Sequence, residues 1–553
     1  MAFRRPAHRR IFGGTGVRSL VTALALAGLV GMAAAESRPP PAPAPVLEID
    51  DAAYVGTHAD PTGVAVFRGV PFAAAPVGEH RWRPPAPLPS RPGRHEALRF
   101  APACIQGGYM GDWYRGVVAG FGGDPAAVVD PPESEDCLYL NVWRPAGETG
   151  DAGDAPLPVI VFIHGGGNAG GWSWEPNYDG QHLAAQGFVV VTIAYRLGVF
   201  GFFSHPDEPH ANFGLLDQVA ALRWIHTHAD ALGADVDRIT VMGESSGGNN
   251  IVHLMALPAA RDLFQRAVVQ SAGWALRETP LKADQDPAGL ALQEAVLGAG
   301  STLRALRAAD TDAVFAAARS THASRGYDPV VDGVSLSESV FQSVNGGRLA
   351  PVDLLIGSNR DEWLMYLPEA PTLADLTDQG LPEAARAPAT RLLEDGERMA
   401  RTLDRVVTAW QMVCPSLHLA AAVARQGNDS WVYWFTRQRE GDMAATLGAY
   451  HGAELPYVFD THDAWLPTDA DDRRLTARIN AYWTAFARTG DPNPGAQTGI
   501  RTPPWPAYRG DGDDVQRLDT VIEPVHHPEW PLCADLGVRA MGPPDAPDPP
   551  GGP

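Results

Sequence analysis

The feature that most constrains this chain is a serine framed by two glycines, Gly243-Glu244-Ser245-Ser246-Gly247, directly after the strand-like run 238–242. This G-x-S-x-G pattern is typical of a sharp turn from a strand into a helix, where a histidine can reach the exposed serine hydroxyl. Glycine suits both ends of the turn because a side chain there would jam the helix against the strand. With 58 glycines in 553 residues, an ordinary glycine-rich loop remains the alternative for this motif alone.

A second glycine-rich segment follows the apolar run 157–163, which predicts a buried parallel strand. The strand leads into His164-Gly165-Gly166-Gly167. Consecutive glycines let the backbone present N–H groups to a ligand, which is what an oxyanion hole requires. We therefore expect the N–H groups of Gly166, Gly167 and Ser246 to be the donors.

An acid and a histidine follow the serine in the chain. The apolar run 352–356 predicts another buried strand, and Asp361 and Glu362 come a few residues after it, where the catalytic edge of an open α/β sheet would lie. His451 is followed by glycine and then by a proline-containing segment, which places it in a loop. The order Ser245, Glu362, His451 is that of α/β-hydrolase triads, although position alone barely separates Glu362 from Asp361.

Together these motifs resemble the type-B carboxylesterase and cholinesterase family of α/β-hydrolases. The likeness spans roughly Ala65 to Tyr508, and its motifs stand in the family's order. Besides the segments above, it includes Phe67-Arg68-Gly69-Val70-Pro71-Phe72-Ala73, residues 134–143, Tyr195-Arg196-Leu197-Gly198, residues 212–218 and residues 486–492.

The resemblance implies an α/β-hydrolase fold: a large, mostly parallel central sheet flanked by helices, with helical insertions around an active-site gorge. It also implies a serine hydrolase that cleaves small-molecule carboxylic esters through an acyl-enzyme, without a cofactor or a metal ion. In that interpretation Ser245 is the nucleophile, His451 the general base and acid, and Glu362 its orienting partner. A non-catalytic adhesion module of the same fold and an amidase or peptidase using the same triad are the alternatives.

Several residues around the expected site admit more than one interpretation. Glu244, beside the nucleophile, is either an electrostatic support for the imidazolium or a buried hydrogen-bonding carboxylate. Ser246, Asn168 and Trp363 stand where the family usually has alanine, an aromatic residue and glycine. We expect Ser246 and Asn168 to make the mouth of the site polar, and hence short acyl esters to be preferred.

Four cysteines in an exported protein indicate two disulfides, with three possible pairings. The resemblance selects Cys104–Cys137 and, for the second pair, Cys414–Cys533. The first bridge would close a loop that contains three aromatic residues, which either line the substrate gorge or only pack the loop; they are Trp113, Tyr114 and Phe121.

The chain is predicted to consist of a signal peptide (1–35), a proline-rich linker (36–45), one large domain (46–541) and a disordered tail (542–553). Basic residues precede the apolar stretch 20–32, and Ala33-Ala34-Ala35 fits a cleavage site, so we expect a periplasmic or secreted protein. Arg9-Arg10 leaves twin-arginine export open beside the general secretory route.

Composition excludes some classes of partner. With 65 acidic against 43 basic residues, the net charge of −22 argues against nucleic acid or an anionic membrane surface as a partner. The pairs His226/His228 and His526/His527 lack the companions and the spacing of a metal site. We also expect no membrane span in the mature chain; nothing in the sequence indicates its oligomeric state.

Overall fold

We describe a computed structural model of the chain, which covers residues 43–145, 155–277, 279–322, 326–441, 443–462, 465–495 and 499–537. The predicted signal peptide, most of the predicted linker and the predicted tail lie outside these described residues.

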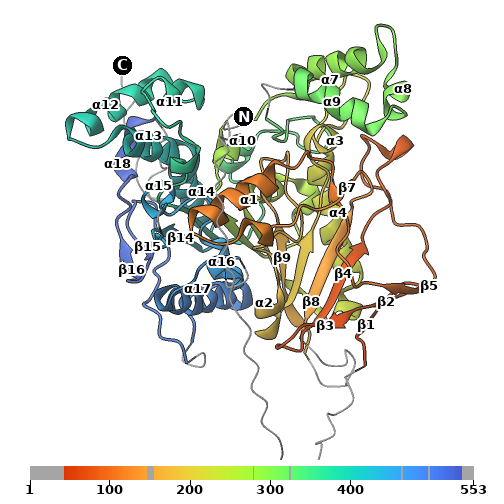
Figure 1. Cartoon of the computed structure of the whole chain (residues 1–553), viewed down its shortest axis with the longest axis horizontal. Coiled ribbons are helices and arrows are strands. Elements are labelled where there is room, and N and C mark those ends of the chain that lie inside the picture. The colour runs from red at the N-terminus through yellow and green to blue at the C-terminus, as the bar shows by residue number, and fades with distance from the viewer. Residues whose placement is uncertain are drawn as a thin grey trace, which may run out of the picture.

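The centre of the molecule is an 11-stranded sheet, several of whose strands are labelled in Figure 1. Its strand order is β16 (Glu523–Val525), β15 (Val515–Leu518), β14 (Ser430–Phe435), β13 (Asp353–Asn359), β12 (Arg266–Gln270), β11 (Ala234–Glu244), β9 (Leu157–Ile163), β10 (Val189–Ile193), β8 (Tyr139–Arg144), β4 (Ala65–Pro71) and β3 (Thr57–His58). The strands from β15 to β10 pair in parallel, and antiparallel strands complete both edges. The predicted mostly parallel sheet is confirmed.

The central strands are apolar because both faces of the sheet are covered. Residues 159–163 of β9 are at most 1 % exposed, as a continuous apolar run predicts for a strand buried on both sides. Two small sheets lie beside the main one: β1 (Val46–Ile49), β2 (Ala52–Val55) and β5 (Gly93–Glu96) form the first, and β6 (Ala103–Cys104) and β7 (Glu133–Ser134) the second.

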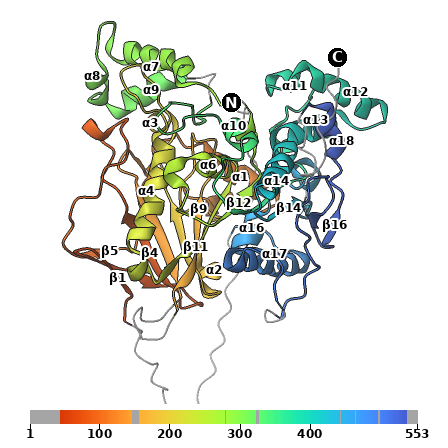
Figure 2. The ribbon, with the colours of Figure 1, turned by 180° about the vertical axis from the view of Figure 1, so that it is seen from behind.

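Helices cover the sheet and extend beyond one of its ends (Figure 2). They are α1 (Tyr109–Gly120), α2 (Gln181–Ala185), α3 (Gly198–Gly201), α4 (Phe213–Thr227), α5 (Ala229–Leu232), α6 (Ser246–Ala256), α7 (Lys282–Leu297), α8 (Leu303–Arg307), α9 (Thr311–Thr321), α10 (Val340–Asn345), α11 (Asp375–Asp378), α12 (Arg386–Glu394), α13 (Met399–Thr408), α14 (Cys414–Arg425), α15 (Ala444–Leu447), α16 (Leu455–Phe459), α17 (Ala470–Thr489) and α18 (Trp530–Asp535). In Figure 1, α7–α9 and α11–α12 form two separate groups at the upper corners of the molecule.

The helical stretch Met399–Arg425 is apolar because it is buried in the protein. Helices α13 and α14 are joined by a π-helical turn, and within the described residues this stretch, Met399–Arg425, alone is long and apolar enough to cross a membrane. Its most apolar part, however, is 94 % buried inside the protein. We therefore interpret it as a core helix, whose apolar surface is covered by its neighbours.

Both expected disulfides are present. Cys104 pairs with Cys137 across a separation of 33 residues, and Cys414 with Cys533 across 119 residues. The first bridge closes the loop that carries α1, and the second joins α14 to α18 near the end of the described chain.

Candidate active site

Ser245 stands at the turn between β11 and α6. Its backbone is in a left-handed conformation (φ 55°, ψ −128°) that is unfavourable for a non-glycine residue. A Cβ atom on Gly243 would lie 2.7 Å from the backbone of Gly247, and one on Gly247 would collide with the carbonyl of Ile163. The two glycines are therefore required by close packing. Ser245 itself is partly exposed, whereas the residues on either side of it are buried.

The glycine loop after β9 lies directly against this turn. A Cβ atom on Gly165 would be 2.9 Å from the Cβ of Ser245, and Gly166 and Gly167 both have positive φ, at 99° and 63°. Among the described residues, none accepts a hydrogen bond from the N–H of Gly166, Gly167 or Ser246. Gly166 and Gly167 directly follow the residue that contacts Ser245, so their N–H groups and that of Ser246 remain the candidate donors of an oxyanion hole.

His451 lies in the loop before α16 and contacts Glu362, which follows β13. The distance from His451 Nδ1 to Glu362 Oε2 is 2.6 Å. The other oxygen of the same carboxylate accepts a hydrogen bond from the N–H of Asn359 at 2.6 Å, and Glu362 is fully buried. A buried carboxylate fixed in this way orients the imidazole and sets its tautomer.

Asp361 faces a different set of partners. Its Oδ2 accepts a hydrogen bond from the N–H of Ala449 at 2.6 Å, and its carboxylate pairs with the guanidinium groups of Arg360 and Arg401. The two adjacent acids therefore point in different directions, and only Glu362 reaches His451.

Glu244 contacts the other nitrogen of the same imidazole. Its Oε1 lies 3.2 Å from His451 Nε2, and Glu244 is 5 % exposed. Burial alone would lower the pKa of His451, but the nearby charges of Glu244 and Glu362 outweigh it and raise this pKa to about 9. Burial raises the pKa of Glu244 itself to about 8. Of the two interpretations of Glu244, the contact with the imidazole favours electrostatic support.

Two further buried carboxylates were not singled out from the sequence. Glu454, three residues after His451, accepts hydrogen bonds from the side-chain amides of Gln270 (2.8 Å) and Asn359 (2.6 Å). Glu175 accepts one from the backbone of Trp172 at 2.9 Å, and burial raises its pKa to about 7. Only their closeness in sequence to the His451 loop and to the glycine loop hinted at these positions.

The aromatic residues of the disulfide loop divide into two kinds. Trp113 is partly exposed, and its Nε1 donates a hydrogen bond to the hydroxyl of Tyr366 at 3.1 Å. The Tyr366 ring lies 6.2 Å from the imidazole of His451, centroid to centroid. Tyr114 and Phe121 are buried and pack the loop. Tyr114 and Phe121 therefore stabilise the loop, whereas Trp113 lies toward Tyr366 and His451.

The prediction of a polar mouth is wrong in its physical basis. Asn168 and Ser246 are completely buried, and the backbone N–H of Asn168 donates to Ser246 Oγ at 3.0 Å. Ser246 Oγ is thus bonded to the Asn168 backbone, and the Asn168 side chain to Asn250 and Tyr327, so both residues have buried partners. Trp363 is also nearly buried, with its backbone N–H bound to Asp404 at 2.9 Å and its indole N–H to Gln379 at 3.0 Å.

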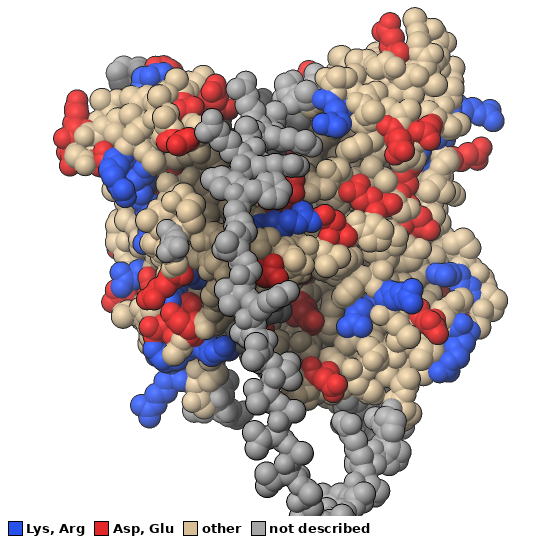
Figure 3. Space-filling model, in the orientation of Figure 1, with Lys and Arg blue, Asp and Glu red and all other residues tan. Residues whose placement is uncertain are grey.

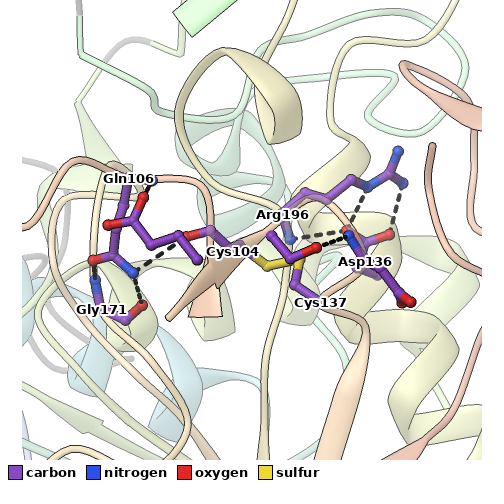
Figure 4. The surroundings of a disulfide bond; sticks show 9 residues. Cys104, Gln106, Asp136, Cys137, Gly171 and Arg196 are labelled. Atoms are coloured by element: carbon purple, nitrogen blue, oxygen red, sulfur yellow. Dashed lines mark hydrogen bonds and ion pairs between the residues drawn. A yellow bond between two sulfur atoms is a disulfide. The ribbon is translucent and has the colours of Figure 1, made fainter. Parts of the chain in front are cut away.

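The first disulfide holds the glycine loop through a neighbouring glutamine. The Gln106 side chain accepts a hydrogen bond from the N–H of Gly171 at 2.8 Å and donates one to its carbonyl at 2.9 Å (Figure 4). In addition, the hydroxyl of Tyr109 on α1 donates to the carbonyl of Gly166. The loop closed by Cys104–Cys137 is therefore bound directly to the segment that carries the expected oxyanion donors.

In the described part of the chain, no three His, Cys, Asp or Glu side chains are grouped so that they could hold a metal ion. On the face shown in Figure 3, acidic and basic side chains are interspersed.

Known proteins resemble this chain over most of its length. Residues 45–527 match the model of the carboxylesterase family. A fumonisin B1 esterase of Sphingopyxis macrogoltabida is 31 % identical over 81 % of this chain and 82 % of its own, and a para-nitrobenzyl esterase of Bacillus subtilis is 32 % identical over 84 % and 94 %. Among solved structures, a PNB esterase and a Geobacillus stearothermophilus carboxylesterase each superpose with a TM-score of 0.74 at 30 % identity, covering 89 % of this chain and 99 % of theirs.

Proposed function

Because the chain belongs to the carboxylesterase family and is a carboxylic ester hydrolase, we propose that it works through a Ser245–His451–Glu362 triad and a backbone oxyanion hole. The observation that carries this proposal is the 2.6 Å contact between His451 and Glu362. It is supported by the close approach of the glycine loop to Ser245 at Gly165.

In the first half-reaction, His451 Nε2 takes the proton of Ser245 as Oγ attacks the ester carbonyl carbon. The carbonyl oxygen gains the negative charge and is bound by the N–H groups of Gly166, Gly167 and Ser246. When the intermediate collapses, the C–O bond to the alcohol breaks, and His451 returns its proton to the leaving oxygen. The products of this step are a free alcohol and an acyl-Ser245 ester.

In the second half-reaction, water attacks the acyl-enzyme with His451 again as the base, which releases the acid and restores Ser245. Glu362 keeps Nδ1 protonated throughout, so that Nε2 stays available as the base. Glu244 stabilises the imidazolium that forms in each transition state, because its carboxylate lies 3.2 Å from Nε2. Each oxyanion donor is typically worth about 3–4 kcal/mol of transition-state stabilisation.

The nucleophile assignment is tested by labelling. A fluorophosphonate should modify Ser245 alone, and Ser245→Ala should lower kcat by about 10⁴–10⁶-fold while leaving the fold intact. Modification of another serine, or near-normal turnover by Ser245→Ala, would contradict the assignment. An adhesion module without enzymatic activity would show neither labelling nor turnover, and a peptidase would cleave amides about as readily as esters.

We further propose that the protein is exported. The two disulfides support an oxidising destination, and the basic and then apolar N-terminal sequence supports a cleaved signal. Mass spectrometry of protein recovered from the cell envelope or the medium should find an N-terminus at or near Glu36. A mature protein that retains residues 1–35 would refute the signal assignment.

A further inference from the structure

Two residues that differ from the family's usual motifs, Ser246 and Asn168, form a hydrogen bond with each other. Ser246 follows the nucleophile, and Asn168 follows the glycine triplet, so they lie on different elements and 78 residues apart. The backbone N–H of Asn168 donates to Ser246 Oγ at 3.0 Å, and neither residue is accessible to solvent. The contact therefore links α6 directly to the glycine loop.

On the basis of the function proposed above, we propose that the hydroxyl of Ser246 is a positioning group that aligns the oxyanion hole. The residue would then act twice: its backbone N–H binds the oxyanion, and its side chain holds the loop that supplies the other donors. Gly167 immediately precedes Asn168, so a fixed Asn168 N–H restricts the backbone next to the N–H groups of Gly166 and Gly167.

The far side of Asn168 is already held. Its carbonyl accepts a hydrogen bond from the N–H of Gly198 at 2.6 Å, and its side-chain amide exchanges hydrogen bonds with Asn250 and donates to the carbonyl of Tyr327 at 3.0 Å. Its φ of 54° is left-handed, a conformation that asparagine tolerates better than most residues. These hydrogen bonds hold Asn168 in place. Ser246 Oγ then links the N–H of Asn168 to α6, the helix that follows the nucleophile.

The glycine loop is also bound to the disulfide loop, at positions before and after Asn168. Tyr109 binds the carbonyl of Gly166, and Gln106 binds both backbone groups of Gly171. The hydroxyl of Tyr195 also donates to the carbonyl of His164 at 2.9 Å, whereas the acceptor for the N–H of Asn168 is Ser246 Oγ. Removing the hydroxyl leaves the N–H of Asn168 buried without its acceptor, which is unfavourable and is relieved only if the segment shifts. Such a shift would move the donors away from the oxyanion, because these lie one and two residues before Asn168.

The test is Ser246→Ala, which deletes the hydroxyl and keeps the backbone N–H. We expect kcat to fall about three- to tenfold, KM to stay within about twofold, and the affinity for an aryl trifluoromethyl ketone to fall by the same factor as kcat. This inhibitor forms a hemiketal oxyanion with the catalytic serine, so it reports on the oxyanion hole. The matched control is Ser430→Ala in β14, which removes a buried hydroxyl bonded to the carbonyl of Ala420 at 3.0 Å. It should lower stability without changing kcat or the affinity for the ketone.

The outcomes separate the two proposals. If Ser246→Ala keeps wild-type kcat and ketone affinity, or loses only thermal stability as Ser430→Ala does, the positioning role is overturned and the esterase mechanism stands. If the wild-type protein neither turns over esters nor is labelled at Ser245, the proposed function itself fails. A parallel loss of kcat and ketone affinity in a folded Ser246→Ala variant supports the positioning role.

Discussion

The carboxylate of Glu244 lies 3.2 Å from Nε2 of His451, while Glu362 contacts Nδ1 of the same ring at 2.6 Å. The imidazole is therefore held between two acids, of which one immediately precedes the proposed nucleophile in the chain. When ionised, both carboxylates stabilise the protonated ring, which favours the imidazolium of the transition states but also makes the free base harder to form as the pH falls.

This arrangement predicts an unusual effect of Glu244→Gln on the pH dependence. A protonated His451 cannot accept the proton of Ser245, so kcat/KM falls as the pH drops through the pKa of His451, which the two acids raise to about 9. Glu244→Gln removes one of the charges that raise this pKa, and the acidic limb of kcat/KM should move to lower pH. At high pH kcat should instead fall below that of the wild type, because the imidazolium loses support. The profile of kcat/KM should be measured from pH 5 to 10. If kcat/KM of Glu244→Gln is lower at every pH but its acidic limb stays at the wild-type pH, this role is contradicted.

The two adjacent acids give a matched pair of variants. Glu362→Gln should leave folding nearly unchanged and lower kcat about 10³–10⁴-fold, because an amide at Nδ1 favours the wrong tautomer of His451. Asp361→Asn should act through stability, since its carboxylate pairs with Arg360 and Arg401 and binds the N–H of Ala449. Turnover at saturating ester and thermal unfolding should be measured for both. A greater loss of kcat in Asp361→Asn would transfer the triad role to that residue.

Removing Cys414–Cys533 should lower stability more, whereas removing Cys104–Cys137 should lower kcat more. Chain entropy predicts a loss of about 4 kcal/mol of stability on removing Cys104–Cys137 and about 5 kcal/mol on removing Cys414–Cys533, whose loop is longer. Only the first bridge lies two residues from Gln106, which binds the glycine loop. Double Cys→Ser variants, assayed well below their unfolding temperatures, should therefore show the larger loss of kcat for Cys104–Cys137. Equal losses of kcat would refute this link to the oxyanion hole.

Trp113 should influence which esters bind. Its indole is partly exposed and reaches Tyr366, whose ring is close to His451. Trp113→Ala should raise KM for a phenyl ester about fivefold, equivalent to about 1 kcal/mol of lost apolar contact, and raise KM for a methyl ester less. Phe121→Ala, which truncates a buried ring of the same loop, serves as the control and should lower stability without this selectivity. Equal KM changes for both esters in Trp113→Ala would exclude contact with the alcohol group.

The backbone features of the site could be read from the sequence. Gly243, Gly247 and the glycine triplet mark places where a Cβ atom would collide or where φ is positive, and such requirements are local. The continuous apolar runs before each motif likewise predict strands buried on both faces. These local requirements, in the family's order, were enough to predict the fold, the elbow and the glycine loop.

Only the tertiary structure decided which side chains face one another. That Glu362 and not Asp361 reaches His451 depends on contacts across 89 residues, and the pairing of Asn168 with Ser246 on contacts across 78 residues. The predicted polar mouth failed for the same reason, because a polar residue type does not reveal whether its groups face a substrate or a buried partner. The sequence by itself determined the backbone turns that hold the reacting groups. The packing of distant segments determined the direction of each side chain, since that direction is set by neighbours that are remote in the chain.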